Sequence, residues 1–446
     1  MRRPINPFRI LILGYLGMVL LGALLLYLPS SSKGISFIDS LFTATSATCV
    51  TGLIVKNTAT DFTLSGKLII LALIQIGGLG YMTLSTAFLF LLGRRVSLQT
   101  RLLMKESINY LSYENLRRFA FTILKVTVVM EGLGALLLFL YFFKGMPLRE
   151  ALLQGIFHAV SAFCNAGFST FSNNLLNYSK DFFVPLVVST LFVAGGLGFV
   201  VISDLYKTYV KRENRRMLLH SRIVLSTTLF LILAGTLFIA LLEWNRSLAG
   251  YQVSHKVLIS YFQAVTPRTA GFSLTNISLF NPITLILLLC LMFIGASPGG
   301  TGGGIKTTTI SLLFIQARSF LRGRDETIAF HHRIPSQLSL RAFTIFLLSF
   351  LWVLTSTLLI LILEKGNGGI LRTLFEVTSA FGTVGLSMGS KLVPNLSASA
   401  DFSIWGKLII ILTMLAGKAG TLSLGAALVR REREVYQYPT GRVSIG

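Results

Sequence analysis

The sequence has few charged residues. Only 13% of its 446 residues are charged, while 53% are hydrophobic. A soluble chain of this length could not bury so much apolar surface, so a bilayer must solvate much of the protein. Acidic residues are the scarcest, with 17 Asp and Glu against 40 Lys and Arg, a net charge of +23. No nucleic-acid-binding motif accompanies this charge, so we expect no nucleic-acid partner.

Cysteine and the residues of catalytic sites are also scarce. The three cysteines, Cys49, Cys164 and Cys290, match neither a metal-ligand spacing nor a paired disulfide framework. The pair His331-His332 has no partner carboxylate cluster, and no nucleophile–base constellation occurs elsewhere. We therefore expect no enzyme and no cofactor bound by this chain.

Eight apolar stretches reach the length that crosses a bilayer, about 20 residues. These predicted spans cover 10–29, 68–92, 120–143, 184–206, 222–242, 283–296 with its glycine-rich continuation, 342–363 and 406–429. The two termini and the loops on their side of the membrane contain 24 Lys and Arg, against 13 in the loops opposite. The positive-inside rule therefore predicts a multi-pass protein of the cell membrane with both termini in the cytoplasm.

A short motif recurs between successive pairs of spans. In each copy a Phe precedes a glycine by nine or ten residues, and a bulky apolar residue follows the glycine. The motifs run from Phe42 to Leu53, from Phe157 to Phe168, from Phe262 to Phe272 and from Phe375 to Leu386, with glycines 115, 104 and 114 residues apart. The next helix repeats as well, since Ile76-Gly-Gly-Leu-Gly80 matches Ala194-Gly-Gly-Leu-Gly198, with looser copies at 294–300 and 415–420.

The repeat predicts an all-α polytopic membrane protein built from four tandem helix–pore-loop–helix units. These contribute eight transmembrane helices and four re-entrant pore helices in a pseudo-fourfold arrangement around one pore. We place the units at 1–100, 101–215, 216–330 and 331–446, the last with a short C-terminal tail.

The repeated motif itself indicates a cation pore. Each segment before its glycine is too short to cross a bilayer, so it should enter the membrane and return, which non-helical backbone does only when it is buried or lines a watery cavity. Four such loops would form rings of backbone carbonyls that replace the hydration shell of potassium, with the negative helix ends nearby. The predicted filter comprises Val50, Thr51, Gly52, Asn165, Ala166, Gly167, Thr269, Ala270, Gly271, Thr383, Val384 and Gly385. The alternative is that each glycine only caps a short buried helix.

At these motifs, across nearly its whole length, the chain resembles the Trk/Ktr/HKT superfamily of potassium translocators. It starts directly at the first span and is most similar to the membrane subunit of Ktr systems (KtrB-like). In that family the four glycines belong to the selectivity filter, and glycine at position 52, where some sodium-preferring plant members carry serine, implies potassium preference. A sodium dependence of uptake stays open.

A glycine-rich stretch, Ser297-Pro-Gly-Gly-Thr-Gly-Gly-Gly-Ile-Lys306, interrupts the third unit. Five glycines and a proline cannot hold a regular helix, and the stretch lacks the strand and Gly-Lys pair of a phosphate-binding loop. The resemblance implies an intramembrane loop that gates the pore; the alternative is a simple kink. The predicted gate comprises Gly299, Gly300, Thr301, Gly302, Gly303, Gly304 and Lys306, together with Lys418 of the last span.

Buried charges need an explanation in a membrane protein. Lys418 either raises the barrier to cations or pairs with the gating loop, and the alternative is a structural partner for a free carbonyl. We expect Glu131 to form a helix–helix hydrogen bond, Arg268 to anchor its loop, and His158 to pack in the core.

The main alternative function is an ion-coupled secondary carrier for a monovalent cation. Carriers usually contain inverted repeats and midplane carboxylates, whereas these units are parallel and the pathway is almost free of acids. Because no soluble stretch exceeds about 30 residues, nucleotide sensing requires another chain. The resemblance implies a homodimer on a cytosolic ring of RCK-type regulatory subunits that bind ATP or ADP. The tail segment Arg430–Tyr436 is a candidate dimer contact.

Overall fold

The computed structural model describes residues 7–80, 116–213, 216–324, 326–366 and 368–420. In these ranges the regular structure is helical apart from one antiparallel hairpin, β1 (Thr327–Ala329) with β2 (His332–Ile334), and two isolated β-bridges, Ser32 with Phe62 and Ile294 with Ile305. The α-helices are α1 (Pro7–Tyr27), α2 (Phe37–Thr48), α3 (Leu64–Leu79), α6 (Leu116–Phe142), α7 (Leu148–Phe163), α8 (Phe183–Leu197), α9 (Phe199–Leu205), α10 (Leu219–Glu243), α11 (Val253–Val265), α12 (Pro282–Phe293), α13 (Thr307–Leu321), α14 (Ser336–Leu363), α15 (Ile370–Gly382) and α16 (Ile404–Ala419). Short 3₁₀ turns lie at Leu176–Tyr178, Ile277–Leu279 and Ala398–Asp401, and a π-helical turn, η2, at Tyr206–Val210.

Three of the described helices are long and apolar enough to cross a membrane: Phe119–Phe142, Leu219–Glu243 and Ser336–Leu363. The two apolar helices on either side of Gly198 are bent by 98° relative to each other, and they make a fourth span only if both are counted as one. The prediction of a continuous helix over 184–206 is therefore wrong. Gly198 has φ +93°, and a Cβ there would lie 2.5 Å from the carbonyl oxygen of Pro298, so this break is built for glycine.

Helix α1, with 21 residues, is as long as its predicted span over 10–29, whereas α12 is shorter than predicted. Helix α12 ends at Phe293, before the glycine-rich stretch, whereas the sequence predicted a span over 283–296. Helices α3 and α16 end at Gly80 and Gly420, both with positive φ. The rest of the predicted spans 68–92 and 406–429, and the tail segment 430–436, lie outside the described residues.

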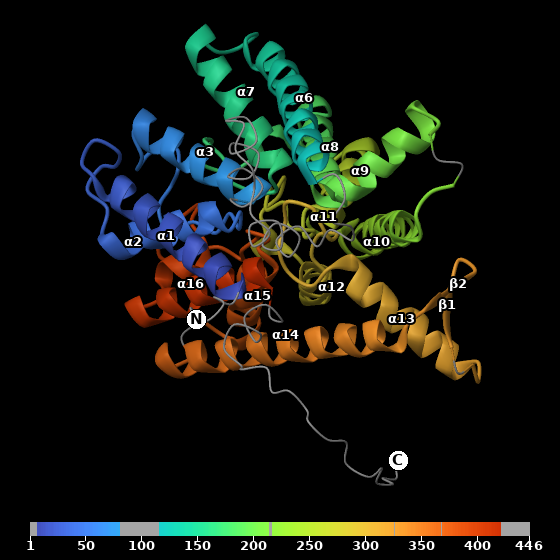
Figure 1. Ribbon diagram of the computed structural model, residues 1–446. Coiled ribbons are helices and arrows are strands. Elements are labelled where there is room, and N and C mark those ends of the chain that lie inside the picture. Colours follow the sequence, from blue (N-terminus) through green and yellow to red (C-terminus); the bar gives the residue numbers. More distant parts are fainter. Residues whose placement is uncertain (1–6, 81–115, 214–215, 325, 367, 421–446) are drawn as a thin grey trace, which may run out of the picture.

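The chain circles a centre, as the colours in Figure 1 follow one another from α1–α3 in blue through α6–α8 and α10 to α14–α16 in orange and red. Four short helices, α2, α7, α11 and α15, each contact the longer helix before them. Each also contacts a helix of another part of the chain: α3 contacts α7, α8 contacts α11, α12 contacts α15, and α16 contacts α2. These four contacts close a cycle between the N-terminal and C-terminal parts of the chain.

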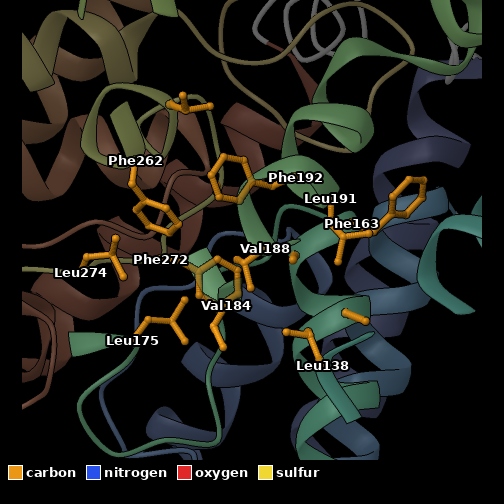
Figure 2. Packing of buried hydrophobic residues seen from close by; sticks show 14 of the residues in the cluster. Leu138, Phe163, Leu175, Val184, Val188, Leu191, Phe192, Phe262, Phe272 and Leu274 are labelled. Atoms are coloured by element: carbon orange, nitrogen blue, oxygen red, sulfur yellow. The ribbon is translucent and has the colours of Figure 1, made fainter. Parts of the chain in front are cut away.

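Buried aromatic side chains hold the short helices in place. The Phe that opens each repeated motif is fully buried in all four copies, at Phe42, Phe157, Phe262 and Phe375. Figure 2 shows Phe262 near Phe192 and Phe272, within the largest core cluster. The rings of Phe192 and Phe262 meet edge to face with centroids 5.6 Å apart, a favourable arrangement for aromatic pairs. The sequence repeat is thus a repeat of packing anchors.

Side-chain caps define where several of these helices begin. Ser36 accepts a hydrogen bond from the Asp39 amide at the start of α2, and Thr63 accepts one from Gly66 at the start of α3. Ser403 caps α16 in the same way. A cap satisfies a backbone N–H that has no partner inside the helix, which matters most where the surroundings are apolar.

Candidate ion pathway

The four glycines of the repeated motif form a closed ring. A Cβ on Gly52 would lie 2.5 Å from the carbonyl oxygen of Ala166, and one on Gly167 would lie 2.9 Å from that of Ala270. The series continues from Gly271 to the Val384 oxygen at 2.4 Å and from Gly385 to the Thr51 oxygen at 2.2 Å. Each glycine therefore packs against the carbonyl that precedes the next glycine, and the fourth returns to the first.

The backbone in this ring takes a conformation that repeats in every loop. The residue two positions before each glycine has positive φ: Val50 (51°), Asn165 (57°), Thr269 (74°) and Thr383 (50°). The glycines themselves have φ between 68° and 89°. Positive φ is uncommon for residues with a Cβ, and four copies at one position indicate a conformation that the surrounding packing imposes.

A hydroxyl group in or directly after each short helix supports the loop that follows. Ser46 donates to the Leu53 carbonyl at 2.8 Å and accepts from the Gly52 amide at 3.1 Å. Ser161 and Thr266 donate to the carbonyls of Phe168 and Phe272, and Ser379 accepts from the Gly385 amide. The sequence prediction missed these four residues, although a hydroxyl recurs five or six positions before each glycine.

The second helix of three units approaches its own short helix through glycine. A Cβ on Gly77, Gly195 or Gly417 would lie within 2 Å of a carbonyl oxygen, that of Thr48, Phe163 or Phe381 respectively. These carbonyls lie at the C-terminal ends of the short helices, each four residues before a ring glycine. The negative ends of three helices are therefore held directly behind the loops, where they favour a cation.

One side of the ring opens into a vestibule with a volume of about 390 Å³. All four ring glycines line it. Its other lining residues, such as Asn57, Asn174, Ser273 and Ser397, carry amide, hydroxyl or apolar side chains, and none of those described is charged. Hydroxyl and amide dipoles can solvate an arriving ion without binding it as tightly as a carboxylate would.

The glycine-rich stretch, here named the gating loop (297–306), lies against the opposite side of the ring. It is tied to the end of α8, because Ser297 and Thr301 donate backbone hydrogen bonds to the carbonyls of Gly196 and Gly195. Phe199 in turn donates to the Gly299 carbonyl at 3.0 Å. Gly295 pairs with Ile305 across the base of the loop.

Two partly buried lysines hold carbonyls of this loop. Lys306 Nζ donates to Gly302 O, and Lys418 Nζ donates to Thr301 O, both at 2.7 Å. In the repeated helix motif Lys418 occupies the position of Gly78 and Gly196, where the first two units have no side chain. The structure thus brings the predicted gate residues together and places Lys418 directly on the loop.

The gating loop also contacts three of the four ring loops. Thr301 Oγ1 donates to Asn165 Oδ1 at 3.2 Å, and the Gly303 amide donates to Thr383 Oγ1 at 2.8 Å. A Cβ on Gly302 would lie 2.0 Å from Thr269 Oγ1. The loop and the ring are therefore one packed unit.

The other residues singled out from the sequence have structural surroundings. Glu131 accepts a hydrogen bond from Gln75 on α3 at 3.1 Å, which confirms a helix–helix role. His158 is buried and contacts the Gln154 carbonyl and the Ser169 hydroxyl, as expected for a core histidine. Arg268 meets the neighbouring loop through its backbone carbonyl, which accepts from Asn165 Nδ2 at 3.4 Å. Its Nε has no hydrogen-bond partner among the described residues, so the anchoring of the loop by the Arg268 side chain stays a prediction.

Comparisons with known proteins give a consistent result. The family model described as TrkH, cation transport protein, matches residues 6–434. The chain is 37% identical to Ktr system potassium uptake protein B of Bacillus subtilis, over 99% of this chain and 97% of that protein. It is 35% identical to potassium/sodium uptake protein NtpJ of Enterococcus hirae, over 100% and 98%. The crystal structure of the potassium transporter TrkH from Vibrio parahaemolyticus matches with a TM-score of 0.72 at 20% identity, covering 96% of this chain and 86% of that one.

Proposed function

Because the chain belongs to the TrkH family of cation transport proteins, we propose that it takes up potassium through the ring of four glycine loops. The observation that carries this proposal is the closed cycle of contacts from Gly52 through Gly167, Gly271 and Gly385. A ring of this kind presents backbone carbonyls from four directions to one axis, and such carbonyls replace the hydration shell of potassium.

The selectivity filter consists of the three residues that end at each ring glycine. Potassium is coordinated by backbone carbonyls, since the side chains there are apolar or hydroxyl-bearing and the Asn165 amide is engaged with neighbouring residues. The four units, 1–100, 101–215, 216–330 and 331–446, surround this pore with eight transmembrane helices and four pore helices in pseudo-fourfold arrangement. The neutral vestibule leads to the filter from outside the cell.

We propose that potassium is preferred over sodium. Glycine at position 52 supports this preference through the superfamily resemblance, and the Bacillus relative is named for potassium uptake alone. The Enterococcus relative is named for both potassium and sodium, so sodium is the competitor to measure.

The gating loop controls passage on the cytoplasmic side of the filter. Its backbone lies against three ring loops, and Lys418 adds a positive charge next to the ion path. Replacing Lys418 with Met removes both the charge and the hydrogen bond to Thr301 O. We expect unregulated potassium flux to rise roughly ten- to a hundredfold, because a hydrogen bond from a charged group contributes about 1.5–3 kcal/mol. Unchanged flux would show that Lys418 is only a structural partner of the loop.

Regulation requires further chains. The name of the Bacillus relative describes a system, which supports a separate regulatory component. We propose a homodimer in which each subunit has its own pore, seated on a cytosolic ring of RCK-type subunits that bind ATP or ADP. Both termini lie in the cytoplasm, on the side of the membrane where the Lys and Arg residues are concentrated.

The proposal is tested by cation flux into proteoliposomes that contain the purified protein. Potassium, rubidium and sodium are compared in the wild type and in Gly52→Ser. A potassium preference that Gly52→Ser weakens supports the filter. Cation flux that requires a proton gradient, or an ion preference that Gly52→Ser leaves unchanged, contradicts the filter and favours an ion-coupled carrier.

A further inference from the structure

Three of the four filter loops contribute a side chain to the packing of the gating loop. Asn165, Thr269 and Thr383 occupy the equivalent position of their loops, two residues before the glycine, with positive φ. All three are fully buried. The fourth loop has Val50 at this position, whose side chain forms no hydrogen bond, so the contact with the gating loop is asymmetric.

Asn165 connects the gating loop with two filter loops at once. Its Oδ1 accepts from Thr301 Oγ1 at 3.2 Å, and its Nδ2 donates to Thr269 Oγ1 at 3.0 Å and to the Arg268 carbonyl at 3.4 Å. The Thr301 hydroxyl also lies 3.3 Å from the Phe163 carbonyl at the end of pore helix α7. One amide therefore joins the second filter loop, the third filter loop and the gate.

Thr383 provides a second connection on the other side of the gating loop. It accepts from the Gly303 amide at 2.8 Å, and a Cβ on Gly303 would lie 2.7 Å from Thr383 Oγ1 and 3.0 Å from the Gly417 carbonyl. At Gly303 the loop packs closely between the fourth filter loop and α16, so moving away from Thr383 breaks this hydrogen bond.

Breaking these hydrogen bonds affects the filter as well as the gate. The groups are buried, so water does not replace the lost partner unless it enters, and an unpaired buried polar group is costly. Asn165 lies two residues before Gly167, in a backbone conformation that the packing must maintain. Without Thr301, its side chain keeps only the contacts within the filter.

We propose that the gating loop braces the selectivity filter through Thr301–Asn165 and Gly303–Thr383, so that releasing the gate also weakens discrimination between potassium and sodium. This inference rests on the proposed filter and gate. Thr301 and Asn165 are then positioning residues. Substituting them should change the potassium-to-sodium uptake ratio as well as the total flux.

The test uses three substitutions in the full chain, reconstituted in proteoliposomes. Thr301→Val is nearly isosteric but lacks the hydroxyl, whereas Thr301→Ser keeps it. Thr307→Val is the matched control, because the Thr307 hydroxyl donates to Ser297 within the gating loop and not to the filter. Potassium and sodium uptake are measured separately for each variant, without a regulatory partner.

We expect Thr301→Val to raise total flux and to lower the potassium-to-sodium ratio roughly five- to tenfold, as for one buried hydrogen bond. Thr301→Ser should retain the wild-type ratio, and Thr307→Val should change flux without changing the ratio. A Thr301→Val variant with increased flux and an unchanged ratio would overturn the inference, as would a variant unchanged in both. An equal loss of selectivity in Thr307→Val would also overturn it, since any loosening of the loop would then suffice.

Asn165→Val gives an independent measurement if Thr301→Val does not yield folded protein. Valine is accepted in this backbone conformation, because Val50 occupies the equivalent position. Combined with Thr301→Val it should change the ratio by less than the product of the two single changes, since both remove the Thr301–Asn165 hydrogen bond, and fully multiplied effects would refute the coupling. A wild type without potassium preference, or one insensitive to Gly52→Ser, would instead overturn the proposed function and this inference with it.

Discussion

Replacing Gly52 with serine perturbs the ring at a defined atom. A Cβ at this position would lie 2.5 Å from the carbonyl oxygen of Ala166 and 3.1 Å from Gly167 Cα. Because ordinary contacts of a Cβ begin near 3.4 Å, the Ala166 carbonyl must retreat by about 0.5–1 Å. Gly52 also has φ +89°, so the substitution strains its own backbone.

A substitution at Gly34 separates the backbone strain from the displacement of a neighbouring carbonyl. Gly34 has φ +76° and no atom within 4 Å of the position that a Cβ would occupy. Each substitution to serine therefore costs about 1–2 kcal/mol of backbone strain, but only Gly52→Ser displaces a carbonyl of the ring. A change of about 1.4 kcal/mol in the relative stability of the two bound ions alters their ratio tenfold. We expect the potassium-to-sodium ratio to fall by about this factor in Gly52→Ser and to stay at the wild-type value in Gly34→Ser.

The assay is uptake of potassium and sodium into proteoliposomes, with thermal melting of the detergent-solubilised variants as the measure of folding. Comparable melting temperatures with divergent ion ratios would support the geometric argument. The same ratio in both variants would refute it, since displacement of the Ala166 carbonyl would then have no consequence for ion discrimination.

Two further predictions concern residues around the ring. Ser161→Ala removes the hydroxyl that donates to the Phe168 carbonyl, so we expect altered ion selectivity in the same flux assay. Ser260→Ala is the control and should match the wild type, because the buried Ser260 hydroxyl has no hydrogen-bond partner among the described residues. If both variants behave alike, the hydroxyl support is unimportant. Burial alone would raise the pKa of Asp401, but hydrogen bonds from Ser390, Lys391 and Arg372 outweigh it and hold the pKa below its usual value. Ionised Asp401 therefore stabilises the fold above its unfolded pKa of about 3.9, and this contribution is lost as the pH falls through the lower folded value. Asp401→Asn should reduce the melting temperature at pH 7, and the difference from wild type should narrow below about pH 4; a constant difference would contradict this.

The position of the ring was predictable from the sequence because a glycine that tolerates no Cβ leaves a visible signature. Gly52 and its three counterparts follow a Phe at nearly constant spacing, and that Phe is a packing anchor in every copy. The helices over 120–143, 222–242 and 342–363 were predictable from the length of their apolar stretches. The thickness of the bilayer sets a minimum length for each of them. These features depend on local spacing and composition, which a sequence contains.

Which segments contact the ring was decided by the tertiary structure. Nothing in the spacing of Asn165 and Thr301 indicates that they meet, because the contact joins residues 136 positions apart. The 98° break at Gly198 likewise depends on the gating loop, whose Pro298 carbonyl occupies the space that a side chain would need. The four-loop repeat was therefore determined by the sequence itself. The arrangement of the loop 297–306, Lys418 and the ring depended on contacts between distant segments, and such contacts leave no periodic pattern in the sequence.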